Sequence, residues 1–548
     1  MTNKIEQQLK KAIIQAVLEA FDMDIQEDFV VVEIPRDTSF GDYAMNVAMK
    51  LAKALKKSPK EIAETIISHL DFEQANIKEA AVAGPGFINV FIKQDALANN
   101  VLTILKDKEE YGRVSIGNHK KVNLEYVSAN PTGDLHPGHA RGAAIGDCVA
   151  RILDFAGFDV TREYYVNDAG NQINNMAKSL QARYYQVCGK KMEMPEDGYF
   201  GADLIEIAKD LQNEVNNTLI VDNPEENIRV FKAYGLKAEL SKIKEDLETF
   251  NVSFDVYSSE QDIRDRGLVE DALKRLETLD MVYEKDDATW LKTTEYGDDK
   301  DRVIVKSDGF YTYLLPDIAY HLDKVNRGFL WMIDFLGADH HSYVTRLTAA
   351  MEALQVNAQL EVDIIQIARM IKDGEEFKLS KRSGKAVALK DLIEIAGKDA
   401  IRYYFVSKAA DTHMDLDLDM ATKQSNENPV YYVQYAHARV CSILAAKGDL
   451  EIATSLSLLN HPKEIELMKH LNEFPSVVSD AALTRQPHKI ANYTQKVAQL
   501  FHSFYNECYV LDKEKPELSS ERLALVEAIK ITLANALNLI GVSSPEKM

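Results

Sequence analysis

Two short segments of the chain hold residues that could act on a phosphorylated substrate. The first, residues 129–139, reads ANPTGDLHPGH and places His136 and His139 three positions apart around Gly138. Two histidines at the start of a helix can donate hydrogen bonds to phosphoryl oxygens as charge develops in a transition state. Gly138 has no side chain, so an adenine ring could lie against its backbone. An ordinary helix cap is the alternative interpretation of this motif taken alone.

The second segment, residues 377–385, reads FKLSKRSGK and gathers cations and hydroxyl groups in a short stretch. Lys378, Ser380 and Lys381 lie ahead of a Ser-Gly pair, which is typical of a mobile loop. Such a loop could clamp a triphosphate and stabilise the negative charge that develops on a pyrophosphate leaving group. A solvated basic loop is the alternative for this segment by itself.

The pattern around the first segment predicts a strand, a loop and a helix in succession. Apolar residues alternate with polar ones over 122–126, a loop with Gly and Pro spans 128–135, and helical periodicity runs over 137–155. Gly157 predicts the end of this helix, and a second strand is predicted over 158–166. Such βαβ units build parallel sheets that bind nucleotides at the carboxyl ends of their strands. Both histidines should therefore lie at that edge of a sheet.

The remaining patterns predict a multidomain α/β protein. Residues 1–112 carry an amphipathic helix, a capping box and a strand–turn–strand pattern, which indicate an N-terminal α+β domain. A Rossmann-type catalytic domain with a parallel sheet is expected over 113–370, with a charged, mainly helical insertion at about 170–300. A region with the basic loop follows over 371–427, and an all-α domain over 428–548 completes the chain. Two further apolar strands are predicted at 302–306 and 329–336.

The composition excludes several classes of protein. In 548 residues, 64 Lys and Arg stand against 86 Asp and Glu, so the formal net charge is −22. This balance argues against indiscriminate nucleic-acid binding, although a specific RNA partner depends on local patches and not on the sum. No apolar run approaches the roughly 18 residues of a membrane span, and the first residues do not resemble a secretory signal. Four scattered cysteines, with no C-x-x-C pair, favour the cytoplasm and offer no metal site.

Taken together, H-x-G-H and K-L-S-K-R resemble the two signature motifs of the class I aminoacyl-tRNA synthetases. The second motif differs from the usual K-M-S-K-S by Leu379 and Arg382, and it keeps both lysines. Longer strings narrow the resemblance to the arginyl-tRNA synthetase family of the bacterial type, over nearly the whole chain. These strings are residues 125–133, 166–170, 311–320, 399–402 and 428–439, with 40–43 and 84–87 resembling that family's extra leading domain.

The resemblance implies that ATP, together with Mg²⁺, activates L-arginine and that the arginyl group then passes to a ribose hydroxyl of tRNA(Arg). His136, His139, Lys378 and Lys381 would be catalytic, because they can stabilise charge on the phosphates while the substrates are held in position. The residues that the resemblance assigns to ATP are Thr132, Gly133, His136, Gly138, His139, Gly337, Asp339, His340, Lys378, Ser380 and Lys381. No resident metal is expected.

The resemblance also implies a binding site for arginine, formed by Glu125, Ser128, Asn130, Tyr313 and Asp317. A planar guanidinium calls for a carboxylate with bidentate geometry, so the chemistry puts Asp317 and Tyr313 at that end of the ligand. Asn130 is assigned to the backbone end, and Glu125 could pair with either the α-ammonium or the guanidinium. Asp317 could instead cap a helix that begins at Ile318. A site of this kind would reject lysine without an editing domain.

The helical C-terminal domain would read the tRNA anticodon. Tyr431, Tyr435, Arg439 and Met548 are the residues assigned to tRNA, since rings and charge suit the stacking of unpaired bases. For Tyr432 we prefer a place in the core. The N-terminal domain would contact the outer corner of the tRNA, residues 371–427 would contact its stem, and a cytoplasmic monomer is expected.

Two alternatives remain open on the sequence alone. One is another class I synthetase, with the cysteinyl and methionyl enzymes nearest through their helical domains. Selection of cysteine would favour a zinc site rich in thiolates, which four scattered cysteines do not supply. The other is a catalytically inactive paralog that only binds tRNA or protein, and the intact histidines and lysines argue against it.

Overall fold

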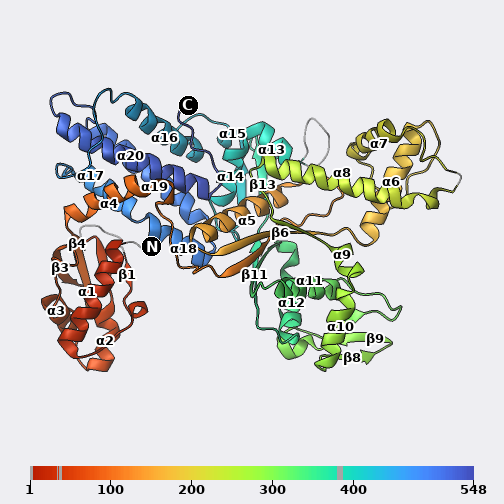
Figure 1. Ribbon diagram of the computed structural model, residues 1–548, viewed down its shortest axis with the longest axis horizontal. Helices are drawn as coiled ribbons and strands as arrows, with labels where there is room; N and C mark the ends of the chain where they lie inside the picture. Colours follow the sequence, from red (N-terminus) through yellow and green to blue (C-terminus); the bar gives the residue numbers. More distant parts are fainter. Residues whose placement is uncertain (1–3, 34, 36–39, 222, 379–386) are drawn as a thin grey trace.

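The computed structural model describes residues 4–33, 35, 40–221, 223–378 and 387–548. Two of the residues assigned to ATP, Ser380 and Lys381, lie outside this part of the chain. An N-terminal α+β part, a central part built on a parallel sheet and a C-terminal helical part follow one another along the sequence (Figure 1). No helix in the part that the structure describes is both long and apolar enough to cross a membrane.

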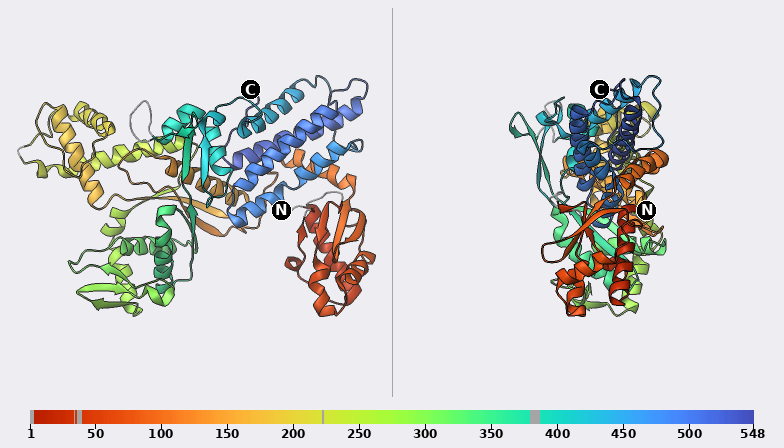
Figure 2. Two further views of the ribbon diagram at one scale, coloured as in Figure 1. Left: turned by 180° about the vertical axis from the view of Figure 1, so that it is seen from behind. Right: turned by 90° about the vertical axis from the view of Figure 1, so that its left-hand side faces the viewer.

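The N-terminal part is a four-stranded antiparallel sheet, in the order β1-β2-β4-β3, covered by helices. The predicted cap at Ser58 is present, because its hydroxyl accepts the Glu61 N–H at 3.2 Å and Pro59 fills the first helical position. Its elements are α1 Lys4–Phe21, β1 Val32–Glu33, β2 Tyr43–Met45, α2 Val47–Leu55, α3 Pro59–Ser68, β3 Ile77–Ala83 and β4 Phe87–Ile92. Figures 1 and 2 show this part beside the C-terminal helices and away from the central sheet. Helix α4, Gln94–Asp107, follows the N-terminal part along the chain and packs against the C-terminal helices.

The central sheet has five parallel strands in the order β12-β11-β5-β6-β7. They are β5 Lys121–Glu125, β6 Asp159–Val166, β7 Val256–Ser259, β11 Trp331–Gly337 and β12 Gln359–Ile365. The register sets Glu125 of β5 opposite Asp334 of β11 on one side and opposite Glu163 of β6 on the other. Three acidic residues therefore lie side by side near the carboxyl ends of the strands.

Helix α5, Pro137–Phe155, follows β5 and lies directly on the sheet (Figure 1). It has the bounds that Pro137 and Gly157 predict, and small residues make this close approach possible. At Gly146 an added Cβ would collide with the ring of Tyr126. Nearly the whole helix is buried, so its N-terminus is held rigidly at the carboxyl edge of the sheet.

The predicted insertion at 170–300 differs from expectation in one respect. Its first half forms a helical arm that reaches away from the sheet, composed of α6 Asn171–Val187, α7 Ala202–Val215 and α8 Ile228–Thr249 (Figure 1). The chain then returns as β7, which pairs with β6, so the range contains one strand of the central sheet. Four half-buried residues with no alternation give this strand no clear signal.

A smaller subdomain follows β7 and ends at β11. It holds α9 Glu260–Asp265, α10 Leu268–Thr278, β8 Val282–Lys285, β9 Ala288–Leu291, β10 Arg302–Val305 and α11 Leu314–Asn326. The strand predicted at 302–306 exists as β10, but it pairs antiparallel with β9 in a separate sheet of the order β10-β9-β8. A local apolar pattern predicts a strand and not its partner.

The C-terminal half continues from β11. The elements up to the helical domain are α12 His341–Ala353, β13 Ala368–Lys372, β14 Glu375–Glu376, α13 Leu389–Ala396, α14 Lys398–Val406, β15 Met414–Asp417 and α15 Leu418–Ala421. The helical domain holds α16 Pro429–Ala445, α17 Pro462–Asn472, α18 Phe474–Thr484, α19 His488–Glu507 and α20 Pro516–Leu539. Buried Arg402 of α14 joins it to the central part, because it donates to Asp147 of α5 at 2.5 Å and to the carbonyl of Ile540 at 3.3 Å.

Candidate active site

The two histidines of the first motif cap helix α5. Nδ1 of His136 accepts the N–H of Gly138 at 3.0 Å and that of His139 at 3.3 Å, while Nδ1 of His139 accepts the N–H of His136 at 3.4 Å. The rings stack, with centroids 3.6 Å apart and an angle of 21° between planes. The cap interpretation of this motif is thus correct as far as it goes. The same geometry leaves Nε2 of each ring to face outward from a helix N-terminus.

Both rings are neutral around pH 7. Burial lowers the pKa of His136, and burial together with the neighbouring His136 ring lowers the pKa of His139 to about 3. Since Nδ1 of each ring accepts a backbone N–H, the neutral rings carry their proton on Nε2. Each ring can therefore donate a hydrogen bond from Nε2 to an anionic ligand at this helix terminus.

A pocket of about 260 Å³ lies beside the histidines. It is lined by Thr132, Gly133, Asp134 and His136, by Tyr199, Gly201, Asp203 and Leu204 of the helical arm, and by Val387 and Ala388. Asp134 ties these walls together, since Oδ1 lies 2.6 Å from Lys242 Nζ of α8 and 3.2 Å from Lys390 Nζ of α13. Burial opposes the charge on Asp134, but the two lysines hold the pKa of its carboxyl below the usual value.

The flanks of the second motif are fixed next to the first. The carbonyl of Lys378 accepts the N–H of Val387 at 3.2 Å, and the N–H of Leu389 donates to the carbonyl of Leu135 at 2.7 Å. Lys378 itself is exposed, with Nζ 3.0 Å from Glu376. Ser380 and Lys381 belong to residues 379–386, which the structure does not describe. Lys378 and residues 387–389, which flank the second motif, therefore lie next to the loop of the first motif although the two are distant in sequence.

The turn after β11 faces the same edge. Gly337 ends the strand, and exposed Asp339 and His340 follow it in a short 3-10 turn. Nε2 of His340 lies 3.5 Å from Oδ2 of Asp339. Asp339 is close enough to oppose the lowering of the pKa of His136. The structure thus brings together the described residues assigned to ATP from both βα turns.

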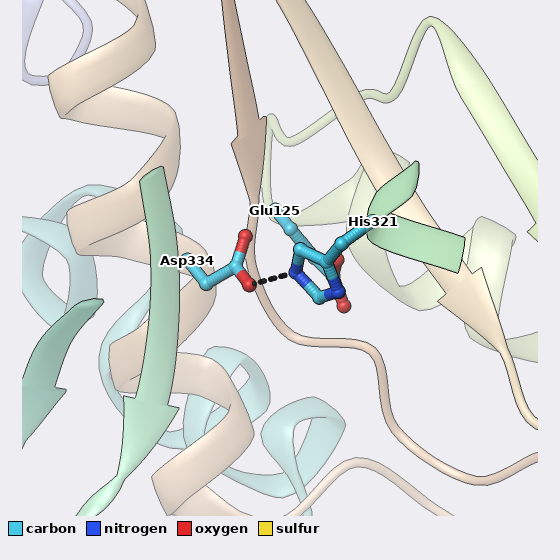
Figure 3. Close-up of side chains that lie close together, drawn as sticks. All are labelled: Glu125, His321 and Asp334. Carbon is cyan, nitrogen blue, oxygen red and sulfur yellow. Dashed lines mark hydrogen bonds and ion pairs between the residues drawn. The ribbon is translucent and has the colours of Figure 1, made fainter. Parts of the chain in front are cut away.

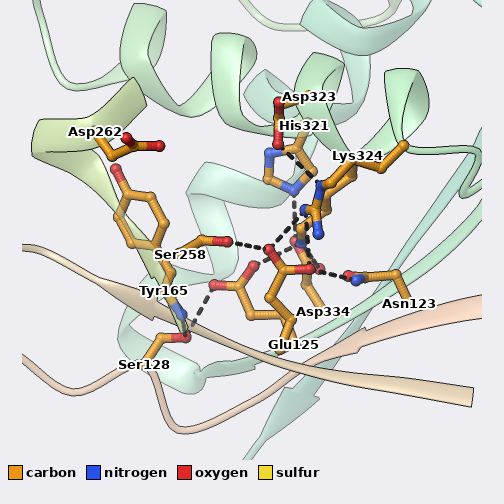
Figure 4. A network of polar contacts seen from close by, with 12 residues as sticks. Asn123, Glu125, Ser128, Tyr165, Ser258, Asp262, His321, Asp323, Lys324 and Asp334 are labelled. Atoms are coloured by element: carbon orange, nitrogen blue, oxygen red, sulfur yellow. Dashed lines mark hydrogen bonds and ion pairs between the residues drawn. The ribbon is translucent and has the colours of Figure 1, made fainter. Parts of the chain in front are cut away.

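The acidic residues near the strand ends are held by cations from α11 and its C-terminal end (Figure 4). Lys324, with no exposed surface, places Nζ 2.6 Å from Glu125 Oε2 and 3.2 Å from Asp334 Oδ1. Half-buried Arg327, the residue after α11, donates to Glu163 at 2.7 and 3.0 Å. The carboxylates of Asp334 and Glu125 keep the pKa of Lys324 above its usual value although burial opposes the charge. Each strand-end acid therefore has a cationic partner.

A histidine continues this network toward the helix start (Figure 3). His321 Nε2 lies 2.8 Å from Asp334 Oδ2, and His321 Nδ1 lies 3.0 Å from Asp317 Oδ1. Burial and Lys324 work against its charge, but the two carboxylates raise the pKa of His321 to about 10. The pKa of Asp334 is correspondingly about 2. Among the described residues, Glu125, His321 and Asp334 have the spacing of metal ligands, yet the Lys324 ammonium already binds both carboxylates.

The residues assigned to arginine lie around this network. Asp317 is in the first turn of α11, which begins at Leu314, so it does not cap a helix beginning at Ile318. Its second oxygen accepts the hydroxyl of Tyr343. Exposed Tyr313 packs its ring 5.4 Å from that of Tyr343. These contacts place an aromatic wall next to the Asp317 carboxylate.

The assigned residues of the β5 turn lie at the same edge. Ser128 Oγ donates to Glu125 Oε1 at 3.0 Å and accepts the N–H of Tyr165 at the same distance. Asn130 donates to Gln172 at 2.8 Å. Glu125 is 8% exposed, and with Lys324 on one oxygen and Ser128 on the other it has little free accepting capacity.

Sequence reasoning missed two residues of this site, Glu260 and Tyr343. Glu260 lies near the hydroxyl of Tyr165. Burial raises the pKa of Tyr165, and the carboxylates of Glu260, Asp317 and Glu125 raise it further. Glu260 is the first residue after β7, so the unrecognised strand hid it. No local signal marks Glu260, because Val256 and Tyr257 are followed by two serines and β7 has no alternation; the residue is placed at the sheet edge only once β7 is paired with β6.

The side chains assigned to tRNA form an aromatic surface on α16. The rings of Tyr431 and Tyr435 are parallel within 9° at 6.0 Å, and His502 of α19 continues the stack at 6.1 Å. Arg439 lies over the ring of Tyr505, with its guanidinium carbon 4.9 Å from the centroid. The residue we preferred in the core, Tyr432, is half-buried and packs its ring 4.8 Å from His502.

The C-terminal tail returns to α16. The carbonyl of Pro545 lies 2.9 Å from His437 Nδ1, and Gln434 donates to the carbonyl of Ser543 at 3.0 Å. Met548, the last residue, is 56% exposed. The helix that carries the aromatic surface therefore also holds the end of the chain.

A parallel sheet with a histidine-capped helix at one βα turn and a lysine motif at the same edge defines a class I aminoacyl-tRNA synthetase. Three family models match the chain: "tRNA synthetases class I (R), catalytic domain" over residues 100–434, "Arginyl tRNA synthetase N terminal domain" over 3–92 and "DALR anticodon binding domain" over 433–548. The chain therefore belongs to the arginyl-tRNA synthetase family. It is an enzyme, and its activity is that of an arginine–tRNA ligase.

Curated relatives and solved structures agree with this assignment. The arginine–tRNA ligases of Bacillus licheniformis and Bacillus subtilis are each 50% identical to the chain, over all of this chain and 99% of theirs. The structure of Thermus thermophilus arginyl-tRNA synthetase matches in fold with a TM-score of 0.78 at 23% identity, covering 99% of this chain and all of that one. A Mycobacterium tuberculosis methionyl-tRNA synthetase shares the fold more distantly, with a TM-score of 0.56 at 12% identity over 76% of this chain and 91% of that one.

Proposed function

We propose how the residues of this site attach L-arginine to tRNA(Arg). ATP binds across the two βα turns, with its phosphates at the N-terminus of α5. Mg²⁺ enters with the nucleotide as part of the substrate, and we assign it no protein ligand. The arginine carboxylate attacks the α-phosphorus, and the bond to the pyrophosphate leaving group breaks. The ribose hydroxyl at the tRNA end then attacks the arginyl carbonyl and releases AMP.

His136 and His139 stabilise the phosphates by donating from Nε2. Their low pKa values support this role, because neutral rings bind the nucleotide as hydrogen-bond donors without repelling Mg²⁺. Lys378 and Lys381 would neutralise charge on the leaving pyrophosphate. The bonds between residues 378 and 387 and between Leu135 and Leu389 support this assignment, since they fix the two ends of the lysine segment next to the loop that leads into α5.

Arginine lies between the carboxylates at the strand ends. One observation carries this assignment: Asp317, held by Tyr343, and Glu125, held by Ser128, are the two ends of one network of contacts through His321, Asp334 and Lys324. Two carboxylates from separate elements, fixed relative to each other, can accept from the two cationic ends of arginine.

We assign Asp317 to the guanidinium and Tyr313 to its hydrocarbon stem. Glu260 adds its Oε2 at the guanidinium end, because Arg264 already donates to its Oε1 at 2.9 and 2.6 Å. Glu125, whose oxygens are already engaged, is left for the α-ammonium with Ser128 and Asn130.

The tRNA is proposed to contact every part of the chain. Tyr431, Tyr435, Arg439 and Met548 would bind the anticodon, because stacked rings with an adjacent guanidinium suit unpaired bases. Residues 371–427 would contact the stem, and residues 1–112 the outer corner. We propose that the enzyme works as a cytoplasmic monomer, which light scattering of the purified chain tests.

Exchange of labelled pyrophosphate into ATP tests the proposed reaction. We expect exchange to require arginine and to be strongly increased by tRNA(Arg). Exchange supported equally by cysteine or methionine would contradict the arginine assignment. The variant Asp317→Ala should mainly raise the KM for arginine, whereas Lys381→Ala should mainly lower turnover. The reverse pattern would mean that these two roles are exchanged.

A further inference from the structure

An unbroken line of polar contacts joins the two ends of the proposed arginine site. It runs from Asp317 through His321, Asp334 and Lys324 to Glu125, with successive distances of 3.0, 2.8, 3.2 and 2.6 Å. Figure 4 shows its part from His321 to Glu125. The three inner residues are almost completely buried, and His321 is 2% exposed. They lie beneath the site, so their contribution to the reaction has to pass through the two outer carboxylates.

The fold explains why the line exists. The strand register sets the acids of β11, β5 and β6 next to one another, and such neighbours repel each other away from water. Helix α11 lies beside these strand ends and carries residues 317, 321 and 324 three and four positions apart, on one face. The same helix therefore supplies a carboxylate for the ligand from its first turn and a cation for the strands from its last.

We propose that His321, Asp334 and Lys324 are positioning residues that hold Glu125 and Asp317 in the orientation arginine requires and that couple the two ends of the ligand. This rests on the proposed role of the two outer carboxylates in binding arginine. Each link fixes the next: Lys324 holds Oε2 of Glu125, and His321 Nδ1 contacts both the carbonyl oxygen of Asp317 at 2.9 Å and its carboxylate Oδ1 at 3.0 Å. The opposite oxygens accept from Ser128 and Tyr343.

Loss of the Lys324 ammonium should affect both Glu125 and Asp317. Burial already raises the pKa of Glu125, so without Lys324 this carboxyl would become neutral and no longer attract the ligand's α-ammonium. Asp334 would then keep only its contact with His321. The imidazole would move toward β11 and away from Asp317. The nucleotide contacts at α5 involve none of these groups.

Steady-state aminoacylation with Lys324→Met tests this coupling. The side chain keeps its length and loses its charge, and we expect the KM for arginine to rise roughly ten- to a hundredfold. The KM for ATP should stay within about twofold, because the substitution touches the arginine end alone. The control is Arg522→Met, which removes a buried pair with Glu464 in the helical domain and should leave both constants unchanged.

A double variant tests whether the two ends are linked. If the line of contacts acts as a unit, Lys324→Met combined with Asp317→Asn should raise the arginine KM by clearly less than the product of the two single effects. Multiplied effects would show that Lys324 acts on Glu125 alone and would overturn the coupling. Should Lys324→Met fail to fold, Asp334→Asn decides by the same criteria, because it keeps the shape and removes the charge between the two cations.

The outcomes separate this inference from the proposed function. If Asp317→Asn leaves the arginine KM unchanged, the arginine site itself is misassigned. If Asp317→Asn raises it and Lys324→Met leaves it within twofold of the parent value, the site stands and the positioning role is wrong.

Discussion

Asp134 Oδ1 lies 2.6 Å from Lys242 Nζ, so the loop ahead of the two histidines is tied to helix α8 of the helical arm. Lys390, which follows the lysine motif, reaches the same oxygen. One carboxylate thus connects the loop, the arm and the segment after the second motif. In the proposed reaction, the position of the ATP phosphates would depend on all three.

The variant Asp134→Asn should weaken nucleotide binding. Its amide keeps the shape but loses the charge that holds both lysines, so we expect the KM for ATP to rise roughly two- to tenfold. The KM for arginine should not change. Asp154→Asn, an exposed acid at the far end of α5, is the matched control and should leave the ATP KM unaltered. An unchanged ATP KM in Asp134→Asn would show that the tie has no role in binding.

The imidazole of His139 should remain neutral far below pH 6.5. Because the folded protein binds this proton less tightly than the unfolded chain, the ring contributes a loss of stability as pH falls from 6.5 toward about 3. NMR titration of ¹⁵N-histidine-labelled protein, assigned with His139→Gln, measures this directly. The thermal midpoint of His139→Gln should also fall less steeply with acid than that of the parent. A His139 titration midpoint near 6.5 would contradict the prediction.

Removal of the buried Arg402 guanidinium should destabilise the whole molecule. Arg402→Met leaves Asp147 buried with one partner fewer, which typically costs about 3–5 kcal/mol. Arg151 binds the same Asp147 oxygen at 2.8 Å from a partly exposed position, so Arg151→Met should lower the thermal midpoint much less. Differential scanning calorimetry of both variants checks this order. Equal midpoints would mean that burial of the pair does not matter.

The stacked surface of α16 should act on tRNA alone. Tyr435→Ala removes one ring of the stack, and base stacking typically contributes 1–3 kcal/mol, so the KM for tRNA should rise roughly five- to a hundredfold. Tyr435→Phe keeps the ring and should bind nearly as well as the parent. Exposed Tyr509, outside this helix, provides the control variant Tyr509→Ala. A tRNA KM that Tyr435→Ala leaves unchanged would remove this ring from the interface.

Local signals account for the elements that the sequence predicts well. Helix α5 has the predicted bounds because Pro137 and Gly157 act within a turn of its ends. The turn between β3 and β4 and the Ser58 cap depend on equally local chemistry. Pairing is different: nothing within residues 302–306 distinguishes an edge of the central sheet from the separate sheet in which β10 lies.

The site shows the same division between local and distant signals. Asp317, Glu125 and the two histidines follow from motifs, whereas the buried state of Lys324 does not. Lys324 follows Asp323 near the end of a helix, and in the sequence this pattern is typical of a solvated helix face. It is buried because β5 and β11 bring two acids from positions about 200 residues apart against it. Such a partner is visible only once the strands are paired.

The order of the strands has a consequence for synthesis on the ribosome. β5 is completed at residue 125, but its neighbour β11 begins only at residue 331. At a synthesis rate of about 5–20 residues per second, one edge of β5 stays unpaired for roughly 10–40 s before β11 emerges. During that interval the nascent chain presents an unpaired apolar edge, which makes the growing polypeptide a natural client for ribosome-associated chaperones.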